Sequence, residues 1–142
     1  PYQGNLPAPL VEACDVLLVN EHELAQLLDR PDQIGPSSDW EGISSELVAK
    51  GFEQVVVTLG PKGSVVVGPN CIEHVGALQV HAVDTTGCGD AYMGAMLAGL
   101  ASGVSLVDSA KLATVVSAYA AMGKGAQASY GTCSQIESKF QV

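Results

Sequence analysis

Apolar runs and amphipathic stretches alternate along the chain and predict strands and helices in turn. Residues 14–20, "CDVLLVN", form a short continuous apolar run, which is typical of a strand buried on both faces of a parallel sheet. Residues 20–29 then place three leucines on one helical face, with acidic residues in the first turn, and Pro31 is expected to end this helix. The opening pattern is therefore a strand followed by a helix.

A second helix and an antiparallel hairpin are predicted next. Residues 38–51 show the spacing of an amphipathic helix. The side chains expected to point inward are Trp40, Ile43, Leu47 and Val48. Residues 54–60 and 63–68 are valine-rich runs separated only by the turn "GPKG", so we expect them to pair as an antiparallel hairpin.

The remaining sequence predicts two short strands and then helices. Residues 71–75 and 78–84 read as strands. Residues 90–103 are expected to form a helix that ends at Gly103, and residues 105–123 one that begins with Ser105 and Asp108 as a capping-box-like pair. Residues 131–142 are expected to form a terminal helix. Strands that alternate with helices in this way indicate an α/β protein.

Composition and charge narrow the class of protein. A length of 142 residues allows one modest hydrophobic core, and because the chain opens on Pro1 rather than Met we expect a fragment or a processed chain. A net charge of -9 with only 6 basic residues disfavours nucleic acid as a partner. The chain has no apolar run of the roughly 20 residues that span a bilayer, and no signal-peptide pattern. We therefore expect a cytoplasmic protein that binds neither membranes nor nucleic acids.

The spacing of cysteine and histidine predicts neither a zinc site nor a disulfide framework. The cysteines are widely separated, with no C-x-x-C pair and no histidine at zinc-finger spacing. We expect free thiols at Cys14, Cys71, Cys88 and Cys133.

The stretch "DTTGCGD", residues 84–90, carries the candidate chemistry. It stands where a predicted strand ends and a helix begins, which is the usual ligand side of an open α/β sheet. Gly87 and Gly89 allow the backbone to turn tightly and approach a ligand. The N–H groups of Gly87, Cys88, Gly89 and Asp90 can then converge on one anion, such as a phosphate.

Asp90 is the candidate general base beside this anion hole. A carboxylate next to a phosphate would repel it, so its presence suggests that a hydroxyl group comes between the two, as in phosphoryl transfer. The alternative is that Asp90 is only a helix N-cap and the glycines only form a turn.

Four motifs in order resemble the ribokinase, or PfkB-type, carbohydrate kinases. They are "NEHE" (20–23), "VTLGPKG" (57–63), "DTTGCGDAYMGA" (84–95) and "GKGAQASY" (123–130). The resemblance implies a ribokinase-like three-layer α/β/α fold with a mostly parallel central sheet. It matches only the C-terminal half of such a kinase, so we expect residues 1–142 to be an incomplete domain without the N-terminal sugar-binding part and its lid. Cys88 departs from the family pattern, which usually has alanine there.

This resemblance implies an activity: transfer of the γ-phosphoryl group of ATP to a sugar hydroxyl. Ribose is favoured by the "GAQAS" segment, while fructose, adenosine or another alcohol acceptor stays open. A nonenzymatic nucleotide-binding remnant of the fold also stays open as an alternative, because the isolated chain lacks the residues that would enclose the sugar. The expected partners are a nucleotide and a small sugar, and homo-oligomerisation is left open.

The resemblance also assigns roles by position. Asp90 becomes the catalytic base and residues 87–90 the anion hole. The nucleotide-binding positions are Asn20, Thr58, Gly60, Gly63, Gly89 and Thr114. Glu23 would hold Mg²⁺ through water, although it also suits an ordinary first-turn helix acid, and "GPKG" also suits a plain hairpin turn. A monovalent cation, expected to be K⁺, would be held mainly by main-chain oxygens of Asp84, Thr86, Ala120, Gly123, Gly125 and Ser129.

Overall fold

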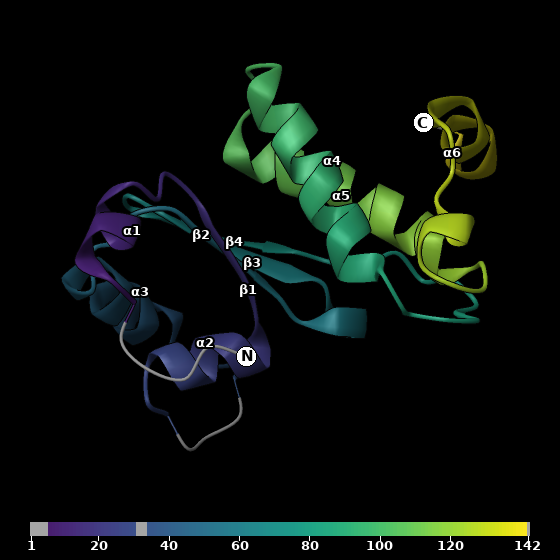
Figure 1. Cartoon of the computed structure of the whole chain (residues 1–142). Coiled ribbons are helices and arrows are strands. Elements are labelled where there is room, and N and C mark those ends of the chain that lie inside the picture. Colours follow the sequence, from purple (N-terminus) through teal and green to yellow (C-terminus); the bar gives the residue numbers. More distant parts are fainter. Residues whose placement is uncertain (1–5, 31–33, 142) are drawn as a thin grey trace. The chain divides into compact units, whose positions relative to one another are not determined.

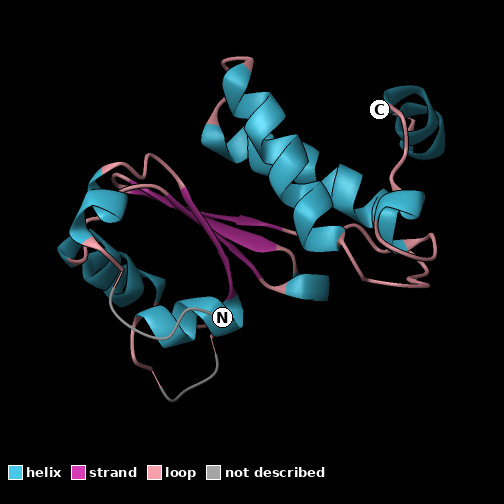
Figure 2. Ribbon diagram, in the orientation of Figure 1, coloured by secondary structure: helices cyan, strands magenta, loops and turns pink. Residues whose placement is uncertain are grey.

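The computed structural model describes residues 6–30 and 34–141 as an α/β arrangement, which confirms the predicted class (Figures 1 and 2). The chain divides into two compact units. The first comprises residues 1–60 and 64–74, and the second comprises residues 61–63 and 75–142. Within the described residues, no helix is long and apolar enough to cross a membrane.

The first unit contains a sheet with the strand order β1-β2-β3-β4. The strands are β1 (Leu17–Asn20), β2 (Val55–Thr58), β3 (Ser64–Gly68) and β4 (Cys71–Val75), whose last residue belongs to the second unit. β1 and β2 are parallel, whereas β2 and β3 are antiparallel. The short 3₁₀ turn η1 (Gly60–Lys62) joins β2 to β3, so the predicted hairpin is confirmed and the described sheet is mixed.

Helices α2 (Glu21–Leu27) and α3 (Trp40–Ala49) share the hydrophobic core of this unit with the sheet, and the short α1 (Ala8–Glu12) precedes β1. Leu24 and Ile43 are fully buried in that core together with alternate valines of β2 and β3. The predicted inward position of Val48 is wrong, because its side chain is 57% exposed. It follows the buried Leu47, and each residue turns the helix by about 100°, which carries Val48 away from the core.

Local side-chain chemistry sets the start of α2. The Asn20 side chain accepts hydrogen bonds from the amides of His22 and Glu23, and the Glu23 carboxylate accepts one from the Asn20 amide. This reciprocal pair is a capping box, which satisfies amides that would otherwise lack partners. Pro31, predicted to end the helix, lies outside the described residues, and α2 ends at Leu27.

The second unit is mainly helical. It contains α4 (Cys88–Ala101), α5 (Leu106–Ala121), the 3₁₀ turn η2 (Gln127–Ser129) and α6 (Cys133–Phe140), so the late helices and the terminal helix are confirmed. α4 and α5 pack against each other. Buried small residues, among them Gly99, Ser109 and Ala113, allow the two helices to approach closely.

The predicted strand at residues 78–84 is wrong. This segment pairs with no strand in the part of the chain that the structure describes. Its amides at Val83 and Asp84 donate instead to the carbonyl of Ala121 at the end of α5, at 2.8 and 3.3 Å. Leu78 and Val83 are 39% and 59% exposed, so the apolar pattern that suggested a buried strand is not buried here.

The close approach of α4 and α5 predicts opposite effects of one substitution at two glycines. A Cβ atom on Gly99 would lie 2.6 Å from Ser109 Oγ, whereas one on Gly94 would meet nothing within 4 Å. We expect Gly99→Ala to lower the free energy of unfolding by about 1–3 kcal/mol through overpacking. Gly94→Ala should raise it by up to about 1 kcal/mol through helix propensity. Urea unfolding monitored by circular dichroism checks both, and equal effects would refute this description of the helix contact.

Candidate active site

The glycine-rich stretch forms a sharp turn directly before α4. Gly87 is the N-cap of the helix and has a φ of 80°, a left-handed conformation that favours glycine. A Cβ atom at this position would lie 2.7 Å from Tyr130 Oη and 2.9 Å from Ala126 Cβ. Backbone conformation and space therefore both favour glycine here. Gly89, two residues later in the sequence, is exposed, and a Cβ atom on it would meet nothing within 4 Å.

The predicted anion hole keeps three of its four backbone donors. The amides of Gly87, Gly89 and Asp90 have no backbone acceptor among the described residues. The Cys88 amide, in contrast, donates to the carbonyl of Thr85 at 3.2 Å and thereby closes the turn. Free amides at the first turn of a helix, together with the positive end of its dipole, suit a bound phosphate oxygen.

Asp90 stands in the first turn of α4 with an exposed side chain. Its carboxylate makes no hydrogen bond or ion pair to any described residue. The alternative interpretation of Asp90 as the N-cap does not fit, because Gly87 occupies that position and no side chain caps α4. Asp90 therefore combines a free carboxylate with neighbouring free amides, which is the arrangement required of a base beside an anion hole.

Asp84 ties the turn to a second loop of the same unit. Its Oδ1 accepts from the amide of Thr86 and its Oδ2 from the amide of Gly125, each at 2.9 Å. Hydrogen bonds from the Thr86 side chain, and then from the amides of Thr86 and Gly125, lower the pKa of Asp84. Backbone amides thus donate to both oxygens of this carboxylate.

The lowered pKa of Asp84 predicts a pH-dependent stability. A carboxyl group whose pKa is lower in the folded than in the unfolded chain stabilises the fold above its unfolded pKa of about 3.9. That contribution is lost as the pH falls through the lower, folded-state pKa. We expect Asp84→Asn to unfold more easily than the wild type at pH 7, and the difference to shrink on acidification below about pH 4. Thermal unfolding across this range checks it, with the exposed Asp15→Asn as the control; a pH-independent difference would contradict it.

The proposed monovalent-cation ligands also belong to the second unit. The carbonyl oxygens of Asp84, Thr86, Gly123 and Gly125 accept no hydrogen bond from the described residues, so they are available to a cation. The Ala120 carbonyl already accepts from the Gly123 amide at 3.2 Å. Ser129 is buried and donates to the Ala126 carbonyl at 2.7 Å. No cluster of three histidine, cysteine, aspartate or glutamate side chains that could hold a metal ion occurs among the described residues.

Three of the predicted nucleotide residues, Asn20, Thr58 and Gly60, lie in the first unit, as does Glu23, the predicted Mg²⁺ residue. Asn20 pairs in register with Thr58 at the carboxyl ends of the parallel strands β1 and β2. Glu23 is exposed on α2, and one carboxylate oxygen, Oε2, is held by the capping box. The other oxygen makes no hydrogen bond to the described residues and can accept from a metal-bound water. Gly60, with a φ of 56°, begins the turn after β2.

Gly63 and Thr114 lie in the second unit. Gly63 has a φ of 95°, and a Cβ atom there would lie 2.1 Å from the carbonyl oxygen of Val75, so glycine is required for the turn itself. Thr114 is buried in α5 and donates its hydroxyl to the Ala110 carbonyl at 2.9 Å. Both residues therefore have structural roles that are independent of a nucleotide.

Two hydroxyl groups beside the turn were not predicted from the sequence. Ser117 of α5 donates to the carbonyl of Cys88 at 3.1 Å, and Tyr130 donates to the carbonyl of Gly87 at 3.0 Å. Burial raises the pKa of the Cys88 thiol, and a hydrogen bond to Ser117 partly offsets that effect. No periodicity or motif in the sequence indicates contacts between residues so far apart in the chain.

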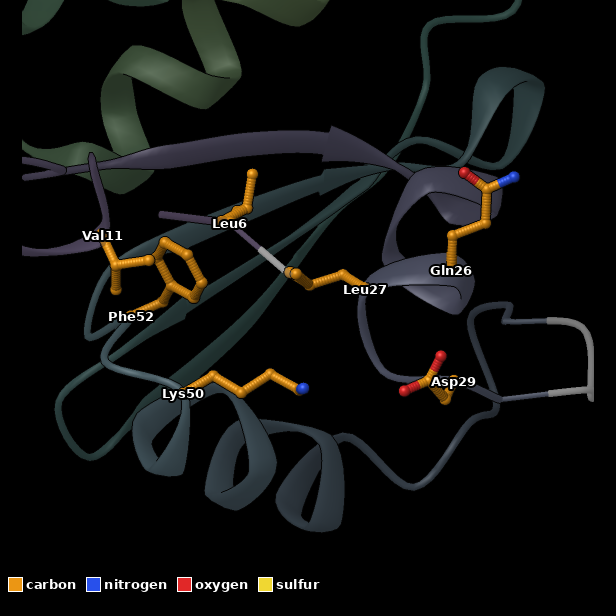
Figure 3. A pocket seen from close by; sticks show the side chains of 7 residues that line it. All are labelled: Leu6, Val11, Gln26, Leu27, Asp29, Lys50 and Phe52. Atoms are coloured by element: carbon orange, nitrogen blue, oxygen red, sulfur yellow. The ribbon is translucent and has the colours of Figure 1, made fainter. Parts of the chain in front are cut away.

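A pocket of about 420 Å³ in the first unit contains none of the predicted site residues (Figure 3). Apolar side chains and a few exposed polar groups line it, namely Leu6, Val11, Gln26, Leu27, Asp29, Lys50 and Phe52. None of its lining residues falls within the four motifs, and we assign it no role in the chemistry.

Comparison with known proteins identifies the class as carbohydrate kinases. Residues 5–133 match the sequence profile described as pfkB family carbohydrate kinase. The chain therefore belongs to the pfkB family, which confirms the resemblance found in its motifs. The sugar kinases of this family are ATP-dependent phosphotransferases.

The matched relatives act on different sugars. The chain is 33% identical over 135 residues to the ribokinase of Schizosaccharomyces pombe. The matched residues cover 94% of this chain and 42% of the relative. The chain is also 33% identical over 123 residues to the deoxyribokinase of Salmonella typhi. Those residues cover 87% of this chain and 40% of the relative. The chain thus spans about two fifths of the length of these relatives.

A solved structure matches the fold of the chain. The fructokinase of Vibrio cholerae O395, in a form with fructose, ADP and calcium ion bound, superposes with a TM-score of 0.77 at 29% sequence identity. The match covers 92% of this chain and 42% of that one. The ribokinase-like fold is therefore confirmed for this part of the domain.

Proposed function

We propose that the chain carries the nucleotide-binding and catalytic-base part of an ATP-dependent sugar kinase. One observation carries this proposal: the unpaired carboxylate of Asp90 stands beside the free amides of Gly87 and Gly89 at the start of α4. The family relationship supports it, since the relatives named above are sugar kinases.

In the proposed reaction, Asp90 accepts the proton of the attacking sugar hydroxyl. The hydroxyl oxygen forms a bond to the γ-phosphorus of ATP, while the bond from that phosphorus to the β,γ-bridging oxygen breaks and ADP leaves. The free amides of Gly87, Gly89 and Asp90 donate to the oxygens of the transferred phosphoryl group and offset their developing charge. Most of the catalysis is thus positioning and electrostatic stabilisation by the start of one helix.

Two metal ions fit this proposal. We assign Glu23 to Mg²⁺ through water, because one of its carboxylate oxygens is not used by the capping box. Bound there, Mg²⁺ would neutralise phosphate charge. The free carbonyls of the two loops joined by Asp84 would hold K⁺. A cytoplasmic location, where ATP is supplied, is consistent with the activity.

Ribose is the proposed acceptor because the "GAQAS" segment and the relative from Schizosaccharomyces pombe both favour it. The test is a panel of ribose, deoxyribose, fructose and adenosine with ATP, Mg²⁺ and K⁺, in which the phosphorylated product is identified by mass spectrometry. We expect the highest kcat/KM with ribose. A higher value with another acceptor would refute ribose alone, and nucleotide binding without any product would favour the nonenzymatic alternative.

A further inference from the structure

We propose that Ser117 and Tyr130 are positioning residues that orient the amides of the anion hole. This inference rests on the proposed kinase function and adds residues to which neither the motifs nor the comparisons assign a role. Both hydroxyls belong to the second unit, as does the turn that they contact.

The two hydroxyls hold successive peptide groups of the turn. Tyr130 Oη donates to the Gly87 carbonyl at 3.0 Å, and Ser117 Oγ donates to the Cys88 carbonyl at 3.1 Å. A peptide group is planar, and its C=O and N–H point in opposite directions. A hydrogen bond to the carbonyl of one residue therefore fixes the direction of the amide of the next.

The consequence differs between the two peptides. In the peptide that joins Gly87 to Cys88, the carbonyl accepts from Tyr130 and from the Ala91 amide at 2.9 Å, and the amide donates to the Thr85 carbonyl, so that plane is fixed at both ends. In the peptide that joins Cys88 to Gly89, Ser117 holds the carbonyl while the Gly89 amide stays free. Ser117 thus directs a donor that is available to the transferred phosphoryl group.

Hydrogen bonds from Ser117 and Tyr130 can restrict the backbone of a stretch that is rich in glycine. Glycine has the greatest backbone freedom of all residues, and the hydroxyls of Tyr130 and Ser117 add contacts to a helix start that contains two glycines and is also held by the hydrogen bond from the Ala91 amide to the Gly87 carbonyl. A hydrogen bond to a carbonyl also polarises the peptide and strengthens its N–H as a donor. The contacts reach the turn from α5 and from the segment after η2, and they are made by an exposed tyrosine and a partly buried serine.

The test compares Ser117→Ala and Tyr130→Phe with two controls that remove a hydroxyl elsewhere in the same unit. Ser102→Ala deletes a serine hydroxyl that donates to the Ala98 carbonyl at 2.9 Å at the far end of α4. Tyr119→Phe deletes the hydroxyl of a second, partly buried tyrosine. Each variant is assayed for kcat, for the KM of ATP and of the best acceptor in the panel, and for the urea midpoint of unfolding.

We expect kcat to fall roughly tenfold in Ser117→Ala and in Tyr130→Phe, with the KM of the acceptor unchanged, because the misplaced donors are proposed to bind the transferred phosphoryl group and not the acceptor. The controls should keep the wild-type kcat, and Ser117→Thr, which retains a hydroxyl, should restore it. If the wild type is active but Ser117→Ala and Tyr130→Phe have the same kcat as the controls, this inference is overturned and the proposed function stands. A loss of kcat that follows the urea midpoint across all variants would also overturn it. A wild-type chain without any product would overturn the proposed function and this inference with it.

Discussion

We expect Asp90→Asn to lower kcat for sugar phosphorylation by roughly 100- to 10,000-fold, the range that loss of a general base produces. Asparagine has nearly the same shape as aspartate but cannot accept the proton of the sugar hydroxyl. The Asp90 carboxylate makes no bond to the described residues, so its replacement removes no structural contact. The affinity for ATP should stay the same or increase, because a negative charge near the phosphates is removed. Steady-state kinetics and calorimetric titration with ATP measure the two effects.

Asp108→Asn is the matched control for this experiment. Asp108 stands in the first turn of α5 as Asp90 does in α4, but its carboxylate pairs with Lys111 and accepts a hydrogen bond from Ser105. The control loses a helix-dipole contribution of the same kind and should keep the wild-type kcat. An Asp90→Asn variant with a kcat within about threefold of the control would exclude Asp90 as the base.

The second prediction with a large expected effect compares alanine substitutions at Gly87 and Gly89, of which the first should disturb the fold and the second only ligand binding. Gly87→Ala forces alanine into a left-handed conformation and places its Cβ 2.7 Å from Tyr130 Oη. We expect this variant to lose about 2–4 kcal/mol of stability from strain and overpacking, together with its activity. Gly89→Ala meets nothing within 4 Å, and alanine is the better helix former, so its stability should not fall.

Gly89→Ala is nevertheless expected to lower kcat/KM for ATP by roughly 10- to 100-fold. Its methyl group would occupy the open space beside the free amides, where the phosphoryl group is proposed to bind. Urea unfolding and kinase assays of both variants give the comparison. Unchanged activity in a fully folded Gly89→Ala variant would place the phosphoryl group elsewhere.

Local signals in the sequence predicted most of the secondary structure. Buried valine runs, the leucine spacing of residues 20–29 and the glycine-rich stretch at the start of α4 act over a few neighbouring residues, and the structure contains the elements that they indicate. The segment 78–84 failed as a strand because an apolar alternation specifies a strand only when a partner supplies its hydrogen bonds. Val48 failed because a single helical position was assigned to the wrong face.

The contacts that shape the candidate site could not be predicted in the same way. Asp84 bonds to Gly125 and Tyr130 bonds to Gly87, over sequence separations of 41 and 43 residues. No local pattern specifies such pairs, because they depend on how α5 and the following loop return to the turn. The sequence also did not predict that the Cys88 amide donates to the Thr85 carbonyl, because a glycine-rich stretch does not specify which of its amides close the turn and which stay free.

Calorimetric titration of the 142-residue chain with ATP and Mg²⁺ tests the central claim most directly. The claim is that the start of α4 binds the phosphates of the nucleotide. The account predicts saturable binding by the wild type and clearly weaker binding by the folded Gly89→Ala variant. Absence of binding by a folded wild-type chain, or equal binding by the two proteins, would contradict it.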